Sequence, residues 1–490
     1  MQISIFIYAF LKLYLILNIY QQAHYQFKFY LKHFLFNFIF YDTFPMIVLM
    51  IGILNPIPVI QIICSIYLVL FAVFYCIARV KLKFTKRIWR LSGICLCYLG
   101  LGLIPYVGPF LLLFLEFSIF PVLGLERGIS YGLNRPYLVR AKQKMTGYTG
   151  RVIAVTGSFG KTSTKVLLNQ ALNLFGSASA TQKSYNTELG ISKFINGIAD
   201  VNVYDTLVLE FGASHRRDIA KLKKIARPQV GFVTGIGYMH VETFGSLETI
   251  IEEKMSLLSG CETAVLNFDC PYIREYPVPK DIHIISYGLE YGYYQAKHIE
   301  DGAFELYYKD TSLGVFKTCL VGRHQILNLT GVLAYLYEMG ASMEILKKGV
   351  LSFQGEKNRL ELKKMNHFTV LDDSFNSNYK GFIEALNILK NHKGKRILIT
   401  PGMVELGRYK KELFAGLVEY MVSSSDIIIL IGYYQTKELY RTLKEYNKEI
   451  YLVRNFMEGY RLFLWIAKQY QDSMLLIEND VPDLYRVGLI

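Results

Sequence analysis

The stretch RVIAVTGSFGKTST, residues 151–164, decides the fold of this chain. It begins with the apolar run 152–155, which is typical of a short buried strand, and the apolar spacing that follows predicts a helix over 163–175. Between the two lie Gly157 and Gly160, which permit backbone conformations that a Cβ would block. Strand, glycine-framed turn and helix, in this order, indicate a loop whose backbone N–H groups surround phosphate.

The turn ends in Lys161 and Thr162, two residue types that phosphate chemistry needs. A lysine at this place brings positive charge to the β- and γ-phosphates, and the neighbouring hydroxyl can bind Mg²⁺. The sequence therefore predicts ATP and Mg²⁺ as cofactors. The predicted ATP-binding residues of the loop are Gly157, Ser158, Gly160, Lys161, Thr162 and Ser163.

The first 125 residues hold most of the apolar excess of the chain. Hydrophobic residues make up 52% of the 490, with 37 Tyr and 32 Phe. A helix that spans a bilayer needs about 20 apolar residues. Apolar runs lie near residues 1–20, 34–54, 57–78, 91–104 and 107–125. They predict a helical membrane region at residues 1–145, with about five spans and the lipid bilayer as a partner.

Basic residues flank these apolar runs. They cluster at 79–90 and at 135–144, as they do on the cytoplasmic side of membrane proteins. We therefore expect a multi-pass protein of the cell membrane whose catalytic domains are cytoplasmic. The flanks also account for much of the net charge of +14, so no nucleic-acid partner is expected. The seven cysteines lack the paired spacing of a metal site.

Beyond residue 145 the chain alternates short β-rich runs with helical patterns. This alternation indicates parallel sheets covered by helices, and the length accommodates two domains. The predicted fold class is α/β: the N-terminal helical membrane region, a P-loop α/β ATPase domain at 146–350 and a Rossmann-like α/β C-terminal domain at 351–490. Ligands of such sheets bind beyond the carboxyl ends of strands, so Asp372 and Asp373 are expected to face a cleft.

Two further polar residues follow predicted strands downstream of the loop. Glu210 closes the apolar run 206–209, where a carboxylate suits a Mg²⁺ ligand or an organiser of water opposite Thr162. His240 follows the strand 230–234 after a glycine-containing turn. Taken alone, a histidine at such a place is more often a surface or capped histidine than a ligand.

Seven motifs in one order resemble the Mur ligase family over roughly residues 150–480. They are TGSFGKTSTK (156–165), SYNTELG (184–190), LEFGASHRRDI (209–219), RPQVGFVTGIGYMHVETFGSLETIIEEK (227–254), GRHQILN (322–328), LDDSFNSN (371–378) and PGMVELG (401–407). Within the family, the resemblance is greatest to ligases that add D-alanyl-D-alanine to a muramoyl tripeptide. It implies an ATP-dependent, ADP-forming carboxylate–amine ligase of peptidoglycan precursor synthesis, with a muramoyl peptide as acceptor and an amino acid or dipeptide as amine.

The resemblance also implies roles for individual residues. Lys161 would act on the phosphates, while Glu210 and His240 match the metal-binding Glu and His of the family. Lys254 matches a lysine that several members carry as a carbamate able to bind a second Mg²⁺; an ordinary helical lysine is the alternative. Nucleotide contacts are implied for His324, Asn328, Arg359 and Asp372, and substrate contacts for Asn186, Thr187, Asp373 and Asn376.

The chemistry that the resemblance implies is transfer of the γ-phosphoryl group to a carboxylate, followed by attack of an amine on the acyl phosphate. The C-terminal domain is expected to close over the cleft, with a hinge near Gly355. The chain departs from the family in its apolar N-terminal segment, which stands where a UDP-binding domain is usual, and in an acidic turn at 478–483 where Lys-Gly-Ser is usual.

These departures leave the substrates open. The acceptor is either the usual UDP-linked precursor or a lipid-linked or polymeric carboxylate, as in a poly-γ-glutamate synthetase. An ATP-driven transporter is a less favoured alternative, because the apolar runs lack clustered charges and no LSGGQ-like segment follows the loop. A catalytically silent scaffold is disfavoured, because the phosphate- and metal-binding residue types are all present.

Overall fold

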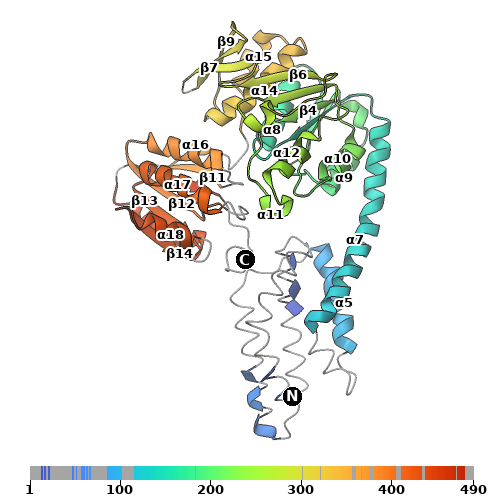
Figure 1. The fold of residues 1–490 in the computed structure, drawn as a ribbon, viewed down its shortest axis with the longest axis vertical. Helices are drawn as coiled ribbons and strands as arrows, with labels where there is room; N and C mark the ends of the chain where they lie inside the picture. The colour runs from blue at the N-terminus through green and yellow to red at the C-terminus, as the bar shows by residue number, and fades with distance from the viewer. Residues whose placement is uncertain are drawn as a thin grey trace. The chain divides into compact units, whose positions relative to one another are not determined.

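The computed structural model describes most of the chain beyond residue 114 and parts of the segment before it (Figure 1). The described residues are 13–14, 16–17, 20–21, 47–48, 51, 57–60, 62–64, 66–67, 85–101, 115–182, 184–300, 302–320, 322–355, 360–365, 367–374, 379–403, 410–432, 436–470 and 472–479. The chain divides into two compact units, Met1–Arg135 with Val481–Ile490, and Pro136–Asp480.

A buried carboxylate in the first unit joins one helix to the first part of another, which continues into the second unit. Helix α5 spans Lys86–Leu101, and helix α7 spans Leu115–Thr146. Glu126 on α7 is fully buried, and its two carboxylate oxygens accept from Arg87 at 2.8 Å and from Arg90 at 3.2 Å. Because a buried charge is costly unless it is paired, these arginines hold the two helices together in this part of the unit.

The predicted membrane location is wrong. Among the residues that the structure describes, no helix combines the length and the apolar character needed to cross a bilayer. Helix α5 has only 16 residues, and the 32 residues of α7 include charges such as Glu126 and Arg127, which interrupt its apolar character. The bilayer partner is withdrawn with this location. Most of the apolar runs at 1–20, 34–54 and 57–78 lie outside the described residues.

A nine-stranded sheet forms the first part of the second unit. Its strands are β1 (Arg151–Thr156), β2 (Ala178–Ala180), β3 (Thr206–Glu210), β4 (Val230–Val233), β5 (Thr263–Asn267), β6 (His283–Gly288), β7 (Tyr294–Glu300), β8 (Ala303–Tyr308) and β9 (Thr311–Lys317). Their order is β2-β3-β1-β4-β5-β6-β7-β8-β9, parallel from β2 to β7. The β7–β8 and β8–β9 pairs are antiparallel, because two-residue links permit only hairpins.

Helices cover both faces of this sheet, as the buried strands require. They are α8 (Lys161–Leu172), α9 (Glu188–Gly197), α10 (Asp218–Ala226), α11 (Val241–Phe244), α12 (Leu247–Met255), α13 (Pro271–Arg274), α14 (Arg323–Glu338) and α15 (Met343–Val350). Residues of α8, α14 and α15 join one hydrophobic cluster, and residues of α9, α10 and α12 join the other (Figure 1).

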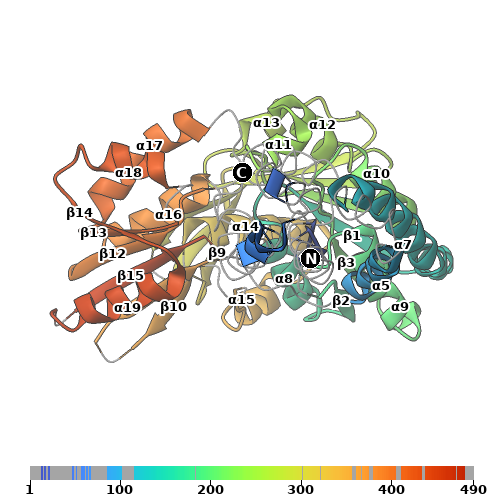
Figure 2. The ribbon, with the colours of Figure 1, turned by 90° about the horizontal axis from the view of Figure 1, so that it is seen from below.

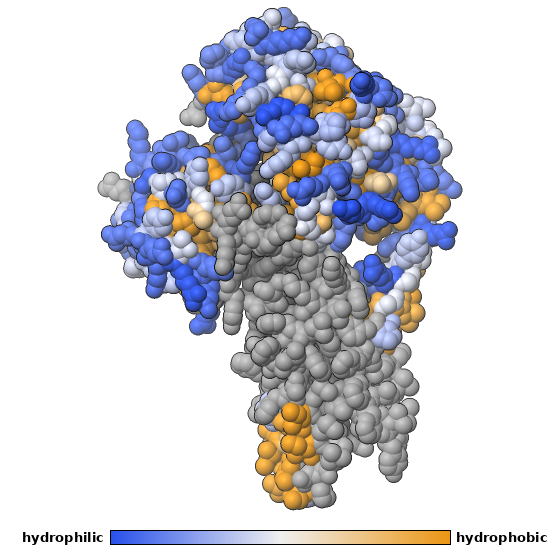
Figure 3. All heavy atoms as spheres, viewed as in Figure 1, coloured by the Kyte–Doolittle hydropathy of each residue, from blue (hydrophilic) through white to orange (hydrophobic). Residues whose placement is uncertain are grey.

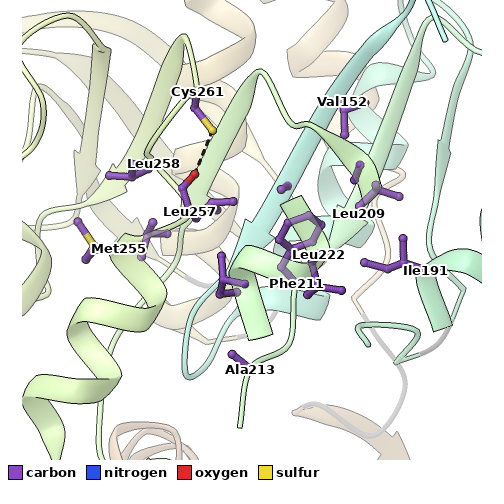
Figure 4. Packing of buried hydrophobic residues seen from close by; sticks show 14 of the residues in the cluster. Val152, Ile191, Leu209, Phe211, Ala213, Leu222, Met255, Leu257, Leu258 and Cys261 are labelled. Atoms are coloured by element: carbon purple, nitrogen blue, oxygen red, sulfur yellow. Dashed lines mark hydrogen bonds between the residues drawn. The ribbon is translucent and has the colours of Figure 1, made fainter. Parts of the chain in front are cut away.

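The alternation of side chains along β1 connects the two clusters. Val152 and Ala154 belong to the cluster of α9, α10 and α12, whereas Ile153 and Val155 belong to the cluster of α8 and α14. Figure 4 shows Val152 and Leu209 among the former, with Ile191 from α9. Successive residues of a strand point to opposite faces, so one apolar run serves both cores.

A second sheet of six strands follows. Its strands are β10 (Glu361–Lys364), β11 (Thr369–Asp373), β12 (Lys395–Thr400), β13 (Ile427–Ile431), β14 (Glu449–Val453) and β15 (Ser473–Glu478), in the order β10-β11-β15-β12-β13-β14. All neighbours are parallel except β10 and β11. The expectation of an α/β fold is thus confirmed, but both sheets are mixed rather than purely parallel.

Helices lie on both faces of the second sheet as well (Figure 2). They are α16 (Tyr379–Lys390), α17 (Lys410–Ser424), α18 (Lys437–Leu443) and α19 (Phe456–Ala467). Side chains of α16, α17 and α18 form one core with Leu398 and Ile428. On α19, Gly459 faces Ile399 and Ile429, whose side chains point to the opposite face. On the visible side of both sheet regions, hydrophilic side chains predominate at the surface (Figure 3).

Candidate active site

The predicted phosphate loop connects β1 to α8, and two of its glycines are required by its shape. Gly160 precedes α8 with a left-handed φ of 81°, and Gly157 has φ 153°. A Cβ on Gly160 would lie 2.8 Å from Oδ1 of Asn328, and one on Gly157 would lie 2.3 Å from Oγ1 of Thr234. The loop therefore keeps a close backbone path at the start of a helix, where N–H groups and the helix dipole favour an anion.

Lys161 lies over the loop that it follows. Its Nζ donates to the carbonyl oxygens of Gly157 at 2.7 Å and of Ser158 at 3.1 Å. The loop and the lysine thus fit a nucleoside triphosphate, because the ammonium group lies beside the loop backbone whose N–H groups would bind the phosphates. Ser158 is held in turn by Gly237, whose N–H donates to its hydroxyl at 3.1 Å.

A cavity of about 330 Å³ opens in front of this loop. It brings together residues from strand ends and helix starts that are far apart in the sequence. The predicted site residues on its wall are Gly157, Ser158, Gly160, Lys161, Thr162, Asn186, Thr187, Glu210, His240 and Lys254. This convergence at the carboxyl ends of β1 and β3 is where ligands bind in parallel α/β sheets.

Glu210 lies at the end of β3 and is only 1% exposed. Its Oε2 accepts from Nζ of Lys165 at 3.0 Å, and its Oε1 accepts from Nδ2 of Asn186 at 3.0 Å. Burial by itself would raise the pKa of Glu210, but the charges of Lys165 and Lys161 and the bond from Asn186 outweigh it and hold the pKa below its usual value. The group is therefore a carboxylate at neutral pH.

His240 and Thr162 complete the polar wall. His240 is half-buried and has a left-handed φ of 59° just before α11, and Thr162 is 3% exposed at the start of α8. Within the described part of the chain, no three His, Cys, Asp or Glu side chains are grouped as a metal cage. A nucleotide-bound Mg²⁺ needs no such cage, since it is usually bound by one or two carboxylates together with phosphates and water. Glu210 fits as the carboxylate, and Thr162 and His240 offer further ligand atoms on the same wall.

Lys254 reaches the same cavity from α12. Its side chain is buried, with 3% of the residue exposed, and its Nζ donates to the carbonyl oxygen of Ala213 at 3.0 Å. Burial, together with the charge of Lys161, lowers the pKa of Lys254 to about 7, while the charges of Glu253 and Asp218 act in the opposite direction. At neutral pH the amine therefore exists in both its neutral and its charged form.

A second cavity, of about 360 Å³, lies on the other side of Phe159. The predicted site residues on its wall are Gly160, Ser163, His324, Asn328 and Asp373. Phe159 lines both cavities. His324 and Asn328 both lie on α14, four residues apart, so they share one face of that helix.

One predicted nucleotide residue, Asp372, lines neither of these two cavities. Asp372 is 8% exposed, and its carboxylate accepts from Nζ of Lys363 at 2.6 Å, so its observed contact is within the second sheet. Burial acts to raise the pKa of Asp372, yet the bonds from Lys363 and Ser374 hold it below its usual value. Arg359 and Asn376 lie outside the described residues.

The sequence alone assigns no role to Lys165, although its Nζ donates to Oε2 of Glu210 at 3.0 Å. A signal was present: Lys165 lies four residues after Lys161, on the helix whose Leu167 and Leu168 are buried. A charged residue on a buried helix face calls for a charged partner. The partner itself, 45 residues further along the chain, had no local signal.

Comparisons with known proteins identify the family of this chain. The family model for the Mur ligase middle domain matches residues 155–336, and that for the Mur ligase glutamate ligase domain matches residues 358–477. UDP-N-acetylmuramoyl-tripeptide--D-alanyl-D-alanine ligases of Synechocystis sp. and Escherichia coli are 31% and 28% identical to this chain. The matches cover 59% and 52% of this chain and 64% and 59% of those relatives, so the chain spans less than two thirds of their length.

Solved structures show the same fold. MurF ligase from Thermotoga maritima, in complex with ADP, has a TM-score of 0.60 and 26% identity, with 73% of this chain and 84% of that chain covered. MurF from Acinetobacter baumannii has a TM-score of 0.64 at 22% identity, with 72% and 79% covered, a likeness of fold alone. Since the two Mur ligase models together match well over half of the residues, this chain belongs to the Mur ligase family, whose members are ATP-dependent, ADP-forming amide ligases.

Proposed function

We propose that this protein is an ATP-dependent carboxylate–amine ligase of peptidoglycan precursor synthesis, with the substrates of its MurF relatives: a UDP-linked muramoyl tripeptide and D-alanyl-D-alanine. The observation that carries the proposal is the single cavity in which the phosphate loop, Glu210, His240 and Lys254 meet. A phosphate site alone would fit any ATPase. Asn186 and Thr187 on the same wall add polar groups for a second substrate.

The first step would activate the acceptor. A carboxylate oxygen of the acceptor attacks the γ-phosphorus of ATP, the bond from that phosphorus to the β–γ bridging oxygen breaks, and ADP leaves with an acyl phosphate formed. Lys161 and the loop N–H groups would hold the phosphates while the charge redistributes. Thr162, Glu210 and His240 would hold Mg²⁺, which neutralises phosphate charge when bound.

The second step would form the amide. The amine nitrogen attacks the acyl carbon, a proton is released, and inorganic phosphate leaves from the tetrahedral intermediate. Positioning accounts for much of the rate enhancement in such a reaction. Two reactants that are already held in place do not lose translational and rotational entropy on the way to the transition state. Thr187 caps α9 by accepting from the N–H of Gly190 at 3.3 Å, and this contact keeps the neighbouring Asn186 at the cavity wall.

Lys254 would contribute as a carbamate. Its amine is buried at the cavity wall beside the carbonyl of Ala213, within the electrostatic influence of Lys161. Addition of CO₂ to the neutral amine would replace a buried cation by an anion. That anion would be attracted to Lys161 and would offer oxygen ligands of the kind that Mg²⁺ prefers.

The test is product formation by the full-length protein. ATP, Mg²⁺, UDP-muramoyl-tripeptide and D-alanyl-D-alanine are incubated with the wild type, Lys161→Ala, and Lys193→Ala as a matched control on the exposed surface of α9. We expect phosphate release that requires both the carboxylate and the amine, with a pentapeptide product by mass, from the wild type and Lys193→Ala alone. Phosphate release that depends on neither the carboxylate nor the amine would contradict ligase function. Release that requires some other carboxylate, such as a polyglutamyl chain, would overturn the substrate assignment only.

A further inference from the structure

The ion pair between Lys165 and Glu210 lies at the edge of the reaction cavity. Lys165 belongs to the second turn of α8, and Glu210 ends β3. The side chains are 3% and 2% exposed, and Nζ and Oε2 are 3.0 Å apart. Glu210 also accepts from Asn186, and its own N–H donates to Oγ1 of Thr181 at 3.1 Å. Two side chains thus hold the carboxylate, and a third holds the backbone of the same residue.

Two lysines of α8 act on this carboxylate. Lys161 and Lys165 are four residues apart, so they lie on the same helix face about one turn from each other. Both ammonium groups act electrostatically on Glu210 and favour its ionised form. The structure gives the contact to Lys165, whereas Nζ of Lys161 donates to the carbonyls of Gly157 and Ser158 in the loop.

We infer that Lys165 is a positioning residue: by pairing with Glu210, it keeps Lys161 directed to the phosphate loop. A buried carboxylate that loses its partner recruits another cation, because an unpaired charge in the interior is costly. The flexible side chain of Lys161 is one turn away and already within its field. Without Lys165, Lys161 would turn from the loop to Glu210.

Stability by itself gives no reason for this pair. Replacing a buried ion pair by apolar side chains of similar size is often neutral or stabilising. The location next to the loop gives a functional reason, since the pair decides which of two neighbouring lysines is available for phosphate. The inference rests on the proposed function only in requiring that the loop binds a nucleotide.

The test measures nucleotide binding without metal. A fluorescent ATP analogue is titrated in EDTA against the wild type, Lys165→Met, Glu210→Gln and the double variant, so that loss of a Mg²⁺ ligand does not affect the result. Lys165→Met should weaken binding by roughly tenfold to a hundredfold, the range expected when one charge-assisted contact is lost. In the double variant, position 210 has no carboxylate to attract Lys161. Its affinity for the nucleotide should therefore lie within about threefold of the affinity of Glu210→Gln. Lys193→Met, on exposed α9, is the control and should bind as the wild type.

The outcomes separate this inference from the proposed function. Unchanged affinity of Lys165→Met would overturn the inference. A double variant that binds the nucleotide as weakly as Lys165→Met would overturn it too, because a merely structural role of Lys165 gives that result. If Lys165→Met does not fold, Glu210→Gln and the double variant decide: equal affinities are expected, and weaker binding by the double variant overturns the inference. A wild type that binds no nucleotide would overturn the proposed function as well, whereas product formation with normal Lys165→Met binding would overturn the inference alone.

Discussion

Lys254 provides the prediction that the structure supports in most detail: uptake of CO₂ at neutral pH. The amine nitrogen adds to the carbon of CO₂ and a proton is released, so only the neutral amine reacts. Burial, together with the charge of Lys161, lowers the pKa of Lys254 to about 7, against a reference of 10.5. At pH 7 about half of this amine is neutral, compared with roughly one part in three thousand for a lysine of ordinary pKa.

The surroundings of Lys254 also favour the product. The charge of Lys161 opposes an ammonium group at this position and attracts an anion. The expected pH dependence follows from the direction of the shift: as pH rises through 7, the amine loses its proton and the carbamate increases. Between pH 6 and pH 8 the neutral fraction rises from about one tenth to about nine tenths.

The measurement is ¹³C NMR of protein equilibrated with ¹³C-bicarbonate. The wild type and the control Lys193→Met should show a carbamate resonance that grows from pH 6 to pH 8, and Lys254→Met should lack it. A resonance that persists in Lys254→Met would assign the carbamate elsewhere. A wild type without any carbamate resonance at pH 8 would refute the reasoning, because burial would then not have made this amine reactive.

Three other changes have expected outcomes. Gly160→Ala places a Cβ 2.8 Å from Oδ1 of Asn328 at a left-handed φ, which costs about 1–2 kcal/mol in backbone strain alone. Calorimetry should therefore show nucleotide binding that is weaker by about tenfold or more, and unchanged affinity would contradict the role of the turn. Glu210→Gln should raise the Mg²⁺ concentration for half-maximal phosphate release by roughly tenfold or more, whereas an unchanged requirement would exclude Glu210 as a ligand. Leu398→Ala, at a fully buried position of the second sheet, should destabilise the protein by about 2–5 kcal/mol in urea unfolding; an unchanged midpoint would show that the packing there is not tight.

The strands and helices that position the site could largely be predicted from periodicity. The apolar run before Gly157 and the helix after it form at the expected places, as β1 and α8. Regular alternation of strands and helices does not predict the antiparallel pairs of β7, β8 and β9. Their two-residue links decide the direction, since a link of two residues joins neighbouring strands only as an antiparallel hairpin.

The membrane prediction failed for a different reason. Hydrophobic content was counted in runs, whereas crossing a bilayer requires one long helix with few charges. In the described residues that requirement is not met: α7 is long but charged, and Arg87 and Arg90 of α5 bind its Glu126.

The sequence by itself determined the phosphate loop, because its shape depends on residues within one turn of each other: Gly157 and Gly160 allow the backbone path, and Lys161 follows at the start of the helix. Only the tertiary structure decided which charged side chains surround the loop and how they pair. Lys165 and Glu210 are 45 residues apart, and Lys254 comes from a third element. Burial, partner and pKa are properties of an environment that distant segments build together, so no local pattern could reveal which lysine pairs with the carboxylate and which becomes a neutral amine.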